Sequence, residues 1–324
     1  MTLLAPPLRA GGTVGVPAPA SPYDERSEID RGIRWWESQG YRVKLGEAAM
    51  DRDDYVAGDP KARAGDLAGL FQDPEVDAVQ VLSGGYGSSQ VAPLLDYEAI
   101  AAHPKPFVGY SDITALHVAI RQRTGLVTFY GPGLSGVASP GRTAFTQDRL
   151  LRALTDPAPL GEVPPRPDDR YVGAIGSGRA SGPLVGGCLW LLRETLATPW
   201  EVDLDGAVVF FEDVDAPPYQ VDGMLTQLSN AGKLGGVVGV AIGEMVRCEP
   251  WRSPDPWVRS RSMEDVFEYH FGPLGVPVVF NLPMGHGKHL ATTPLGVTAT
   301  VDAERRVVSI DEPALRGRVG KEGR

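Results

Sequence analysis

A serine that follows a short apolar segment is the clearest candidate for a reactive side chain in this sequence. Ser111 stands in Lys105-Pro-Phe-Val-Gly-Tyr-Ser-Asp-Ile-Thr114, a pattern that predicts a strand, a sharp turn and a helix start. Such a turn projects a hydroxyl at the carboxyl edge of a sheet, where open α/β folds bind ligands and present nucleophiles. The alternative is that Ser111 only caps the helix. Ile113 replaces the last glycine of the G-x-S-x-G motif, so a typical α/β-hydrolase is not predicted.

A glycine-rich segment, Ser83-Gly-Gly-Tyr-Gly-Ser88, follows another predicted strand at 76–82. Adjacent glycines let a backbone approach a substrate closely and aim an N–H group at a negatively charged oxygen. The segment lacks the third glycine of the dinucleotide-binding motif, so that function is not favoured. The alternative is a tight turn with no further role.

A nucleophilic serine needs a base, and the sequence has five histidines: His103, His117, His270, His286 and His289. His286 is the best placed, because it follows a predicted strand at 278–280 and has a glycine on either side, which leaves room for a substrate. His117 and His270 lie in apolar helical segments and are expected to pack in the core, and His103 precedes a proline in a loop. The spacing of His286 and His289 would suit a metal ion, but no acidic or cysteine partner is near, so no metal is predicted.

A third group must orient the histidine. Glu212 is the first polar residue after the apolar strand predicted at 207–211, and Asp213 and Asp215 are its competitors. Cys188, at a second glycine-to-helix junction, is a rival nucleophile, since thiolates are intrinsically more nucleophilic than hydroxyls. Free cysteine is also a common small core residue, which is the alternative for Cys188.

The elements that must position these groups alternate between strand and helix over the first 130 residues. Strands are predicted at 13–16, 41–45, 76–82 and 106–109, and helices at 27–40, 60–71 and 113–123. Such alternation predicts right-handed crossovers and a mostly parallel sheet.

A proline-rich segment at 156–168, after a predicted helix at 148–154, is expected to be an exposed connection to a second α/β pattern. That pattern comprises strands at 207–211, 237–245, 278–280, 296–301 and 306–310 and a helix at 219–228. Because no helix separates the last two strands, the second half is expected to be richer in strand. The predicted limits are 1–155 for the first domain, 156–180 for the connection and 181–324 for the second domain.

Composition excludes several classes of protein. The 324 residues suggest two domains, and 42% hydrophobic and 22% charged residues are typical of globular proteins. The net charge of −10 argues against a protein that coats nucleic acid, and two cysteines are too few for a disulfide scaffold. The sequence shows no signal-peptide pattern and no run of about 20 apolar residues. A cytoplasmic protein without membrane contact is therefore predicted.

Four blocks of sequence together resemble the LD-carboxypeptidase family of serine peptidases, which includes the microcin C immunity peptidases. The blocks are Gly84-Gly-Tyr-Gly87, Gly109-Tyr-Ser-Asp-Ile-Thr114, Phe210-Phe-Glu-Asp213, and Gly285-His-Gly287 with Thr293-Pro-Leu-Gly296. The resemblance covers nearly the whole chain. It implies an α/β protein with a Rossmann-like N-terminal domain and a strand-rich, swivelling-type C-terminal domain, often as a homodimer.

The resemblance also implies a site in the cleft between the two domains. Ser111, Glu212 and His286 would form a catalytic triad, and the backbone N–H groups of Gly85 and Asp112 would form an oxyanion hole. No metal or other cofactor is expected. Three further residues of these blocks are candidates for lining the substrate cleft: Gly84, Tyr86 and Tyr110.

The implied activity is hydrolysis of an amide through an acyl-enzyme. The leading hypothesis is an LD-carboxypeptidase that releases the terminal D-Ala of muropeptide tetrapeptides in cell-wall recycling. The alternatives are an immunity-type hydrolase of peptidyl or aminoacyl nucleotides, which Thr128-Phe-Tyr-Gly-Pro132 slightly favours, and an inactive protein that only binds a ligand in the cleft. Two departures from the family bear on the substrate rather than on hydrolysis: Cys188 stands where asparagine is common, and Gly223 where arginine is common.

Overall fold

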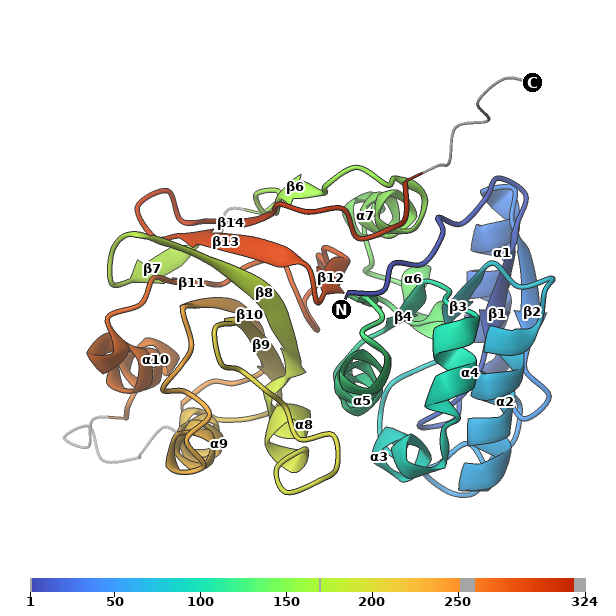
Figure 1. Ribbon diagram of the computed structural model, residues 1–324, viewed down its shortest axis with the longest axis horizontal. Coiled ribbons are helices and arrows are strands. Elements are labelled where there is room, and N and C mark those ends of the chain that lie inside the picture. The colour runs from blue at the N-terminus through green and yellow to red at the C-terminus, as the bar shows by residue number, and fades with distance from the viewer. Residues whose placement is uncertain (1, 169, 251–259, 318–324) are drawn as a thin grey trace.

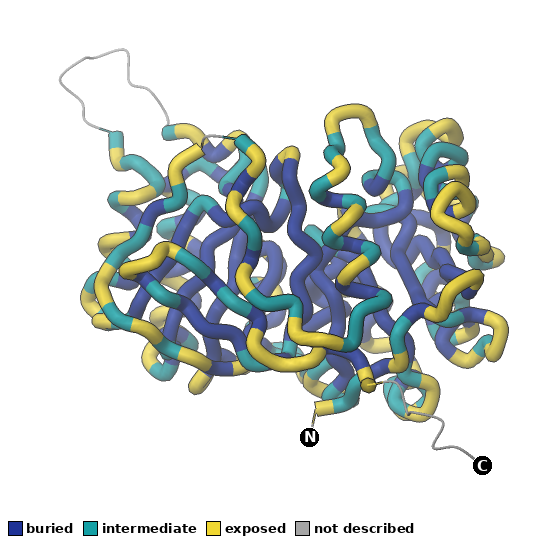
Figure 2. Tube along the Cα trace, turned by 90° about the horizontal axis from the view of Figure 1, so that it is seen from above, coloured by how far each residue is buried: buried dark blue, intermediate teal, exposed yellow. Residues whose placement is uncertain are grey.

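The computed structural model describes residues 2–168, 170–250 and 260–317. Over this part of the chain two sheets stand side by side, with helices packed around them (Figure 1). The N-terminal sheet has six strands in the order β12-β5-β4-β3-β1-β2, and the C-terminal sheet has eight in the order β6-β14-β13-β8-β9-β10-β11-β7. Buried segments run through the middle of both halves (Figure 2). No helix within the described ranges is long and apolar enough to cross a membrane.

Parallel pairing joins five strands of the N-terminal sheet: β1 (Thr13–Val16), β2 (Arg42–Leu45), β3 (Ala78–Gln80), β4 (Phe107–Gly109) and β5 (Thr128–Tyr130). The longer helices of this half are α1 (Arg26–Ser38), α2 (Pro60–Gln72), α5 (Thr114–Thr124) and α7 (Ala144–Thr155). The shorter ones are α3 (Ser88–Val91), η1 (Ala92–Leu94), α4 (Tyr97–Ala102), η2 (Ser111–Ile113) and α6 (Leu134–Val137). The predicted α/β arrangement with a mostly parallel sheet is confirmed.

A buried polar relay fixes the segment that follows β5. The indole of Trp36, on the buried face of α1, donates a hydrogen bond of 2.7 Å to Gln80 in β3. The Gln80 amide in turn donates to the Pro132 carbonyl at 2.8 Å. Because buried polar groups without partners are costly, this relay specifies where the end of β5 lies relative to β3.

The C-terminal sheet is mixed. Its parallel centre consists of β8 (Arg179–Cys188), β9 (Val208–Val214), β10 (Gly239–Val246) and β11 (Val278–Phe280). Its antiparallel strands are β6 (Gly161–Glu162), β7 (Gly173–Ile175), β13 (Thr298–Asp302) and β14 (Val307–Ile310). The helices of this half are α8 (Leu189–Glu194), α9 (Pro218–Asn230), α10 (Met263–Phe271) and η3 (Gly272–Leu274). The predicted strand-rich second half is thus confirmed.

The two halves interlock at several points. β12 (Thr293–Leu295) comes late in the chain but pairs antiparallel with β5 of the N-terminal sheet. β6 and β7 lie within the segment 156–180, expected to be a connection, and form the edges of the C-terminal sheet. Tyr130 and Phe210 belong to one core, with ring centroids 5.1 Å apart. The residue limits of the domains stay a prediction, and residues 251–259 and 318–324 of the second lie outside the described residues.

Candidate active site

Ser111 occupies a strained turn between β4 and α5. Its φ is +62°, a left-handed conformation that costs a non-glycine residue roughly 1–2 kcal/mol and that is often found at functional sites. The predicted strand, turn and helix start are confirmed, with η2 beginning at Ser111 itself. The Ser111 side chain makes no capping hydrogen bond in η2 or α5, so the helix-cap alternative does not describe it.

The structure brings Ser111, His286 and Glu212 together in one hydrogen-bonded series. His286 Nε2 lies 3.0 Å from Ser111 Oγ, and His286 Nδ1 lies 2.7 Å from Glu212 Oε2. The backbone N–H of His286 also donates to Glu212 Oε2, at 3.1 Å. Ser111 follows a strand of the N-terminal sheet, whereas Glu212 belongs to the C-terminal sheet and His286 follows β11 of that sheet. The series therefore joins the two halves, and it can carry a proton from the hydroxyl to the imidazole.

Glu212 lies inside β9 rather than after its end, so the expectation that the strand stops at Phe211 is wrong. Parallel pairing with β8 continues to Glu212, which stands opposite Cys188. The strand tolerates this fully buried carboxylate because hydrogen-bond donors surround it. Strand geometry therefore holds Glu212 more rigidly than a loop would.

The charge of Glu212 determines the basicity of His286. Burial alone would lower the pKa of His286, but the attraction of Glu212, its hydrogen bond and, to a smaller extent, the charge of Asp213 outweigh burial and raise the pKa above 6.5. Arg142 opposes this rise.

The two competing carboxylates point to other partners. Asp213 accepts hydrogen bonds from the backbone N–H groups of Trp190 and Val214, at 2.9 and 2.8 Å, and its burial raises its pKa to about 6. Asp215 forms an exposed ion pair with Arg247, with N–O distances of 2.6 and 2.7 Å. Of these three acids, Glu212 is the one that is hydrogen-bonded to His286.

Cys188 does not have the environment of a nucleophile. Its side chain is buried, and burial together with Asp213 and Glu212 raises the pKa of the thiol well above its ordinary value. Its backbone N–H donates to Thr114 Oγ1 at 2.9 Å, which ties the start of α8 to α5. A thiol that stays protonated suits the alternative of a small core residue.

Three of the other histidines have structural partners, and His103 directly follows α4. His117 is buried against the Gly109 carbonyl at 2.9 Å, and burial lowers its pKa to about 4. His270 lies 2.7 Å from Asp222 Oδ1, and His289 Nδ1 lies 3.0 Å from Thr143 Oγ1. Over residues 2–168, 170–250 and 260–317, no group of three or more His, Cys, Asp and Glu side chains could hold a metal ion.

The glycine-rich loop lies directly beside Ser111. A Cβ on Gly84 would lie 3.0 Å from the Ser111 Cβ, so any side chain there would press on the serine. Ser21 holds the loop, since its backbone N–H donates to the Gly84 carbonyl and its Oγ accepts from Tyr86 N–H. Within the described residues, no hydrogen bond uses the N–H of Gly85 or of Asp112. Both groups are thus free to bind a negatively charged oxygen.

Tyr110 and Tyr86 have different neighbours. The Tyr110 ring is 5.0 Å from the His286 ring, and the Arg142 guanidinium lies over Tyr110 at 5.7 Å from its centroid. Arg142 Nη1 also donates to the Gly287 carbonyl at 2.6 Å, which holds the loop that carries His286. Tyr86 is half exposed and contacts Tyr55 edge-on, with centroids 5.6 Å apart.

Two parts of the site are missing from the sequence-based prediction. Tyr130 donates a hydrogen bond of 2.6 Å to Glu212, and its block Thr128–Tyr130 resembles any apolar strand. Glu244 supports the His286 loop through its N–H bond to the Met284 carbonyl and is paired with Arg166 and Arg170. The one signal in the sequence is that Glu244 is an acid within the otherwise apolar strand β10, where a buried carboxylate needs partners.

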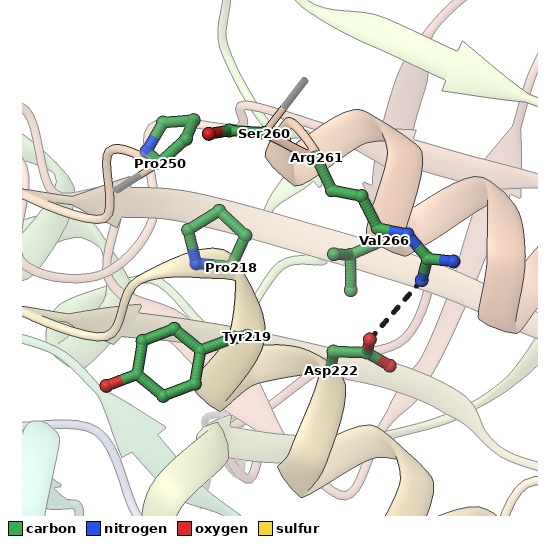
Figure 3. Close-up of a pocket in the computed structure, with 7 residues that line it drawn as sticks. All are labelled: Pro218, Tyr219, Asp222, Pro250, Ser260, Arg261 and Val266. Carbon is green, nitrogen blue, oxygen red and sulfur yellow. Dashed lines mark hydrogen bonds and ion pairs between the residues drawn. The ribbon is translucent and has the colours of Figure 1, made fainter. Parts of the chain in front are cut away.

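A separate cavity of about 320 Å³ lies at the beginnings of α9 and α10 (Figure 3). Asp222 and Arg261 both line it and form an ion pair at 3.4 Å on one of its sides. None of its lining residues belongs to the predicted site. Gly223, one of the two departures from the family, follows Asp222, and a Cβ there would meet nothing within 4 Å.

Replacing Gly285 with alanine is expected to lower kcat/KM about 10²-fold, as misplacement of catalytic groups by about 1 Å does. Gly285 has φ +104°, and a Cβ there would lie only 2.6 Å from Glu212 Cδ, so either the acid or the His286 loop must move. The measurement is the rate of amide hydrolysis by the purified variant. Gly232→Ala is the matched control, since Gly232 also has positive φ but open space around it. Equal rates for the two variants would refute the contact argument.

Comparisons with known proteins identify the family. Residues 14–131 match the LD-carboxypeptidase N-terminal domain, and residues 181–301 match the LD-carboxypeptidase C-terminal domain. The chain is 37% identical to the probable murein peptide carboxypeptidase of Bacillus subtilis, over 96% of this chain and 95% of that protein.

Solved structures agree with this result. The structure of MccF, the microcin C7 self-immunity protein of Escherichia coli, with glutamyl sulfamoyl guanosine has a TM-score of 0.87 at 26% identity. The match covers 97% of this chain and 100% of that one. Muramoyltetrapeptide carboxypeptidase from Oxalobacter formigenes has a TM-score of 0.78 at 27% identity, covering 93% and 99%. The fold and these relatives define a serine-type carboxypeptidase. The chain belongs to the LD-carboxypeptidase family, as its four sequence blocks predicted.

Proposed function

We propose that this protein is an LD-carboxypeptidase that releases the terminal D-Ala of L,D-linked muropeptide tetrapeptides, with Ser111 as nucleophile. The observation that carries the proposal is the series from Ser111 through His286 to Glu212, with its distances of 3.0 and 2.7 Å. In this proposal His286 is the general base and Glu212 orients it and stabilises its charged form. A cytoplasmic location fits a recycling role, and the homodimer stays a prediction.

The reaction begins when His286 Nε2 takes the proton of Ser111 Oγ, which attacks the carbonyl carbon of the scissile amide. The carbonyl oxygen gains the negative charge and binds the N–H groups of Gly85 and Asp112. The N–H of Ser111 itself is already donated to the Tyr130 hydroxyl at 2.9 Å, which leaves those two groups for the oxyanion.

His286 then gives its proton to the leaving nitrogen, the C–N bond breaks, and D-Ala departs with a neutral amine. A water molecule attacks the acyl-enzyme ester while His286 takes one of its protons. Collapse of the second tetrahedral intermediate releases the shortened peptide and returns the proton to Ser111 Oγ. The cycle needs only groups that this chain supplies, together with water.

The identity of the substrate is supported by relatives and by charge. A murein peptide carboxypeptidase is 37% identical, and MccF at 27% is the more distant relative. Arg142 places a half-buried cation beside Tyr110 and the His286 loop. A carboxypeptidase substrate carries a free terminal carboxylate that an arginine binds well. The block 128–132, which favoured the immunity type, is buried and presents no surface to a substrate.

A direct comparison of two substrates tests this proposal. The wild-type protein is incubated separately with the L,D-linked tetrapeptide and with an aminoacyl sulfamoyl adenosine, and release of D-Ala or of the sulfamoyl nucleoside is measured. We expect kcat/KM to be at least about tenfold higher for the tetrapeptide, and a tetrapeptide ending in L-Ala to react far more slowly. A preference for the nucleotide would establish the immunity-type activity, which the MccF complex structures motivate. Binding without hydrolysis of either would establish a cleft-binding protein.

A further inference from the structure

Tyr130 lies at the junction of the two halves, where β5 ends. It pairs with Gly109 of β4 on one side and with Thr293 of β12 on the other. The residue is fully buried, and its ring contacts Phe210 at 5.1 Å, His117 at 5.9 Å and Tyr110 at 6.3 Å between centroids. These contacts hold the ring on several sides, so the hydroxyl cannot turn toward other partners.

The hydroxyl of Tyr130 bridges the two ends of the Ser111–His286–Glu212 series. It accepts a hydrogen bond of 2.9 Å from the backbone N–H of Ser111 and donates one of 2.6 Å to Glu212 Oε1. The directions are fixed, because an N–H group can only donate and a carboxylate can only accept. Glu212 Oε2 is the oxygen that faces His286, so the bonds close into a ring: Ser111 N–H, Tyr130, Glu212, His286 and Ser111 Oγ.

The hydroxyl keeps its proton throughout the range in which an enzyme would work. Burial, and then the negative charge of Glu212, raise the pKa of Tyr130 well above 10. Tyr130 therefore stays a neutral donor to Glu212 at any pH at which His286 titrates.

We propose that Tyr130 is a positioning residue that sets the distance between the nucleophile and the acid–base pair across the junction of the two halves. This inference rests on the proposed roles of Ser111 and Glu212. The Tyr130 hydroxyl accepts a hydrogen bond from the backbone N–H of Ser111. This bond fixes the strained turn and makes the N–H of Ser111 unavailable to the oxyanion. The hydroxyl also donates to Glu212 Oε1, the oxygen that does not face His286. This second bond makes the carboxylate a weaker partner for His286 and limits the basicity of the imidazole.

The test is Tyr130→Phe in the full chain, which keeps the ring and removes both hydrogen bonds. We expect kcat to fall about 10- to 100-fold with KM nearly unchanged, because the groups are misplaced while the substrate surface is intact. We also expect the acidic limb of the pH profile of kcat/KM to move to higher pH, since Glu212 without its donor attracts the proton of His286 more strongly. Tyr97→Phe is the matched control: its hydroxyl donates to the Ala92 carbonyl and not to a group of the Ser111–His286–Glu212 series.

A second variant gives the opposite sign and does not depend on how well Tyr130→Phe folds. Site-specific incorporation of 3-fluorotyrosine at position 130 keeps both hydrogen bonds and makes the phenol a stronger donor. The acidic limb should then move to lower pH. A limb that moves in neither variant would overturn the proposal, even if Tyr130→Phe is less active or less stable. If Ser111→Ala retains activity, the proposed function itself fails, whatever the Tyr130 variants show.

Discussion

Ser111→Ala is expected to reduce kcat on the L,D-linked tetrapeptide by roughly 10⁶-fold, the order of magnitude found when a catalytic serine is removed. Ser111 Oγ is the atom that faces His286 Nε2 at 3.0 Å, and alanine offers no atom that could form an acyl-enzyme. The fold should persist, because alanine bears the φ of +62° about as well as serine does. The measurement is D-Ala release at high enzyme concentration, together with the thermal midpoint of unfolding.

Two further variants make this result specific. Ser38→Ala removes a hydroxyl that binds the Trp35 carbonyl at the exposed end of α1, and it should leave the rate unchanged. Cys188→Ala should also retain hydrolysis, since the thiol is buried and protonated. Activity that survives Ser111→Ala but is lost in Cys188→Ala would transfer the nucleophile to the thiol and contradict the proposed function.

The local parts of this site were predictable from the sequence because they depend on neighbouring residues. The turn at Ser111 follows from an apolar strand that meets a helix start, and the glycines around His286 mark a loop with room beside it. The alternation of strands and helices likewise predicted the parallel N-terminal sheet. The family resemblance then singled out Glu212 among three nearby acids, a choice that the apolar strand alone left open.

The remaining parts depend on contacts between distant segments. β12 is only three residues long and contains a proline, so its own pattern does not predict that it completes the N-terminal sheet. The extension of β9 through Glu212 depends on its pairing with β8, whose last residue is Cys188. The role of Tyr130 is defined by Ser111 and Glu212, which the fold alone brings to its hydroxyl.

Glu212→Gln is expected to lower the maximal rate by about 10⁴-fold, as the corresponding amide substitution does in other serine peptidases. The carboxylate accepts from Tyr130 on one oxygen and from His286 on the other. An amide has one oxygen, so one of these partners must face an N–H donor instead. The substitution also removes the largest attraction that raises the pKa of His286, so the pKa falls toward the value that burial favours, with only Asp213 still opposing burial. Hydrolysis requires neutral His286, so the acidic limb should lie above pH 6.5 in the wild type and move to lower pH in the variant.

Glu212→Gln is expected to lower the maximal rate but to extend activity to lower pH. The second effect distinguishes loss of the orienting charge from misfolding. A misfolded protein would lose rate at every pH with no shift of the limb, whereas loss of the orienting charge lowers the plateau and extends it toward acid. Asp213→Asn is the matched control, since Asp213 is the next residue of β9, is also buried, and is hydrogen-bonded to the start of α8 rather than to His286. Its charge also raises the pKa of His286, but less than that of Glu212, so we expect only a smaller shift of the limb in the same direction. If Asp213→Asn loses as much rate as Glu212→Gln, or if the limb of Glu212→Gln stays at its wild-type position, then Glu212 does not set the basicity of His286.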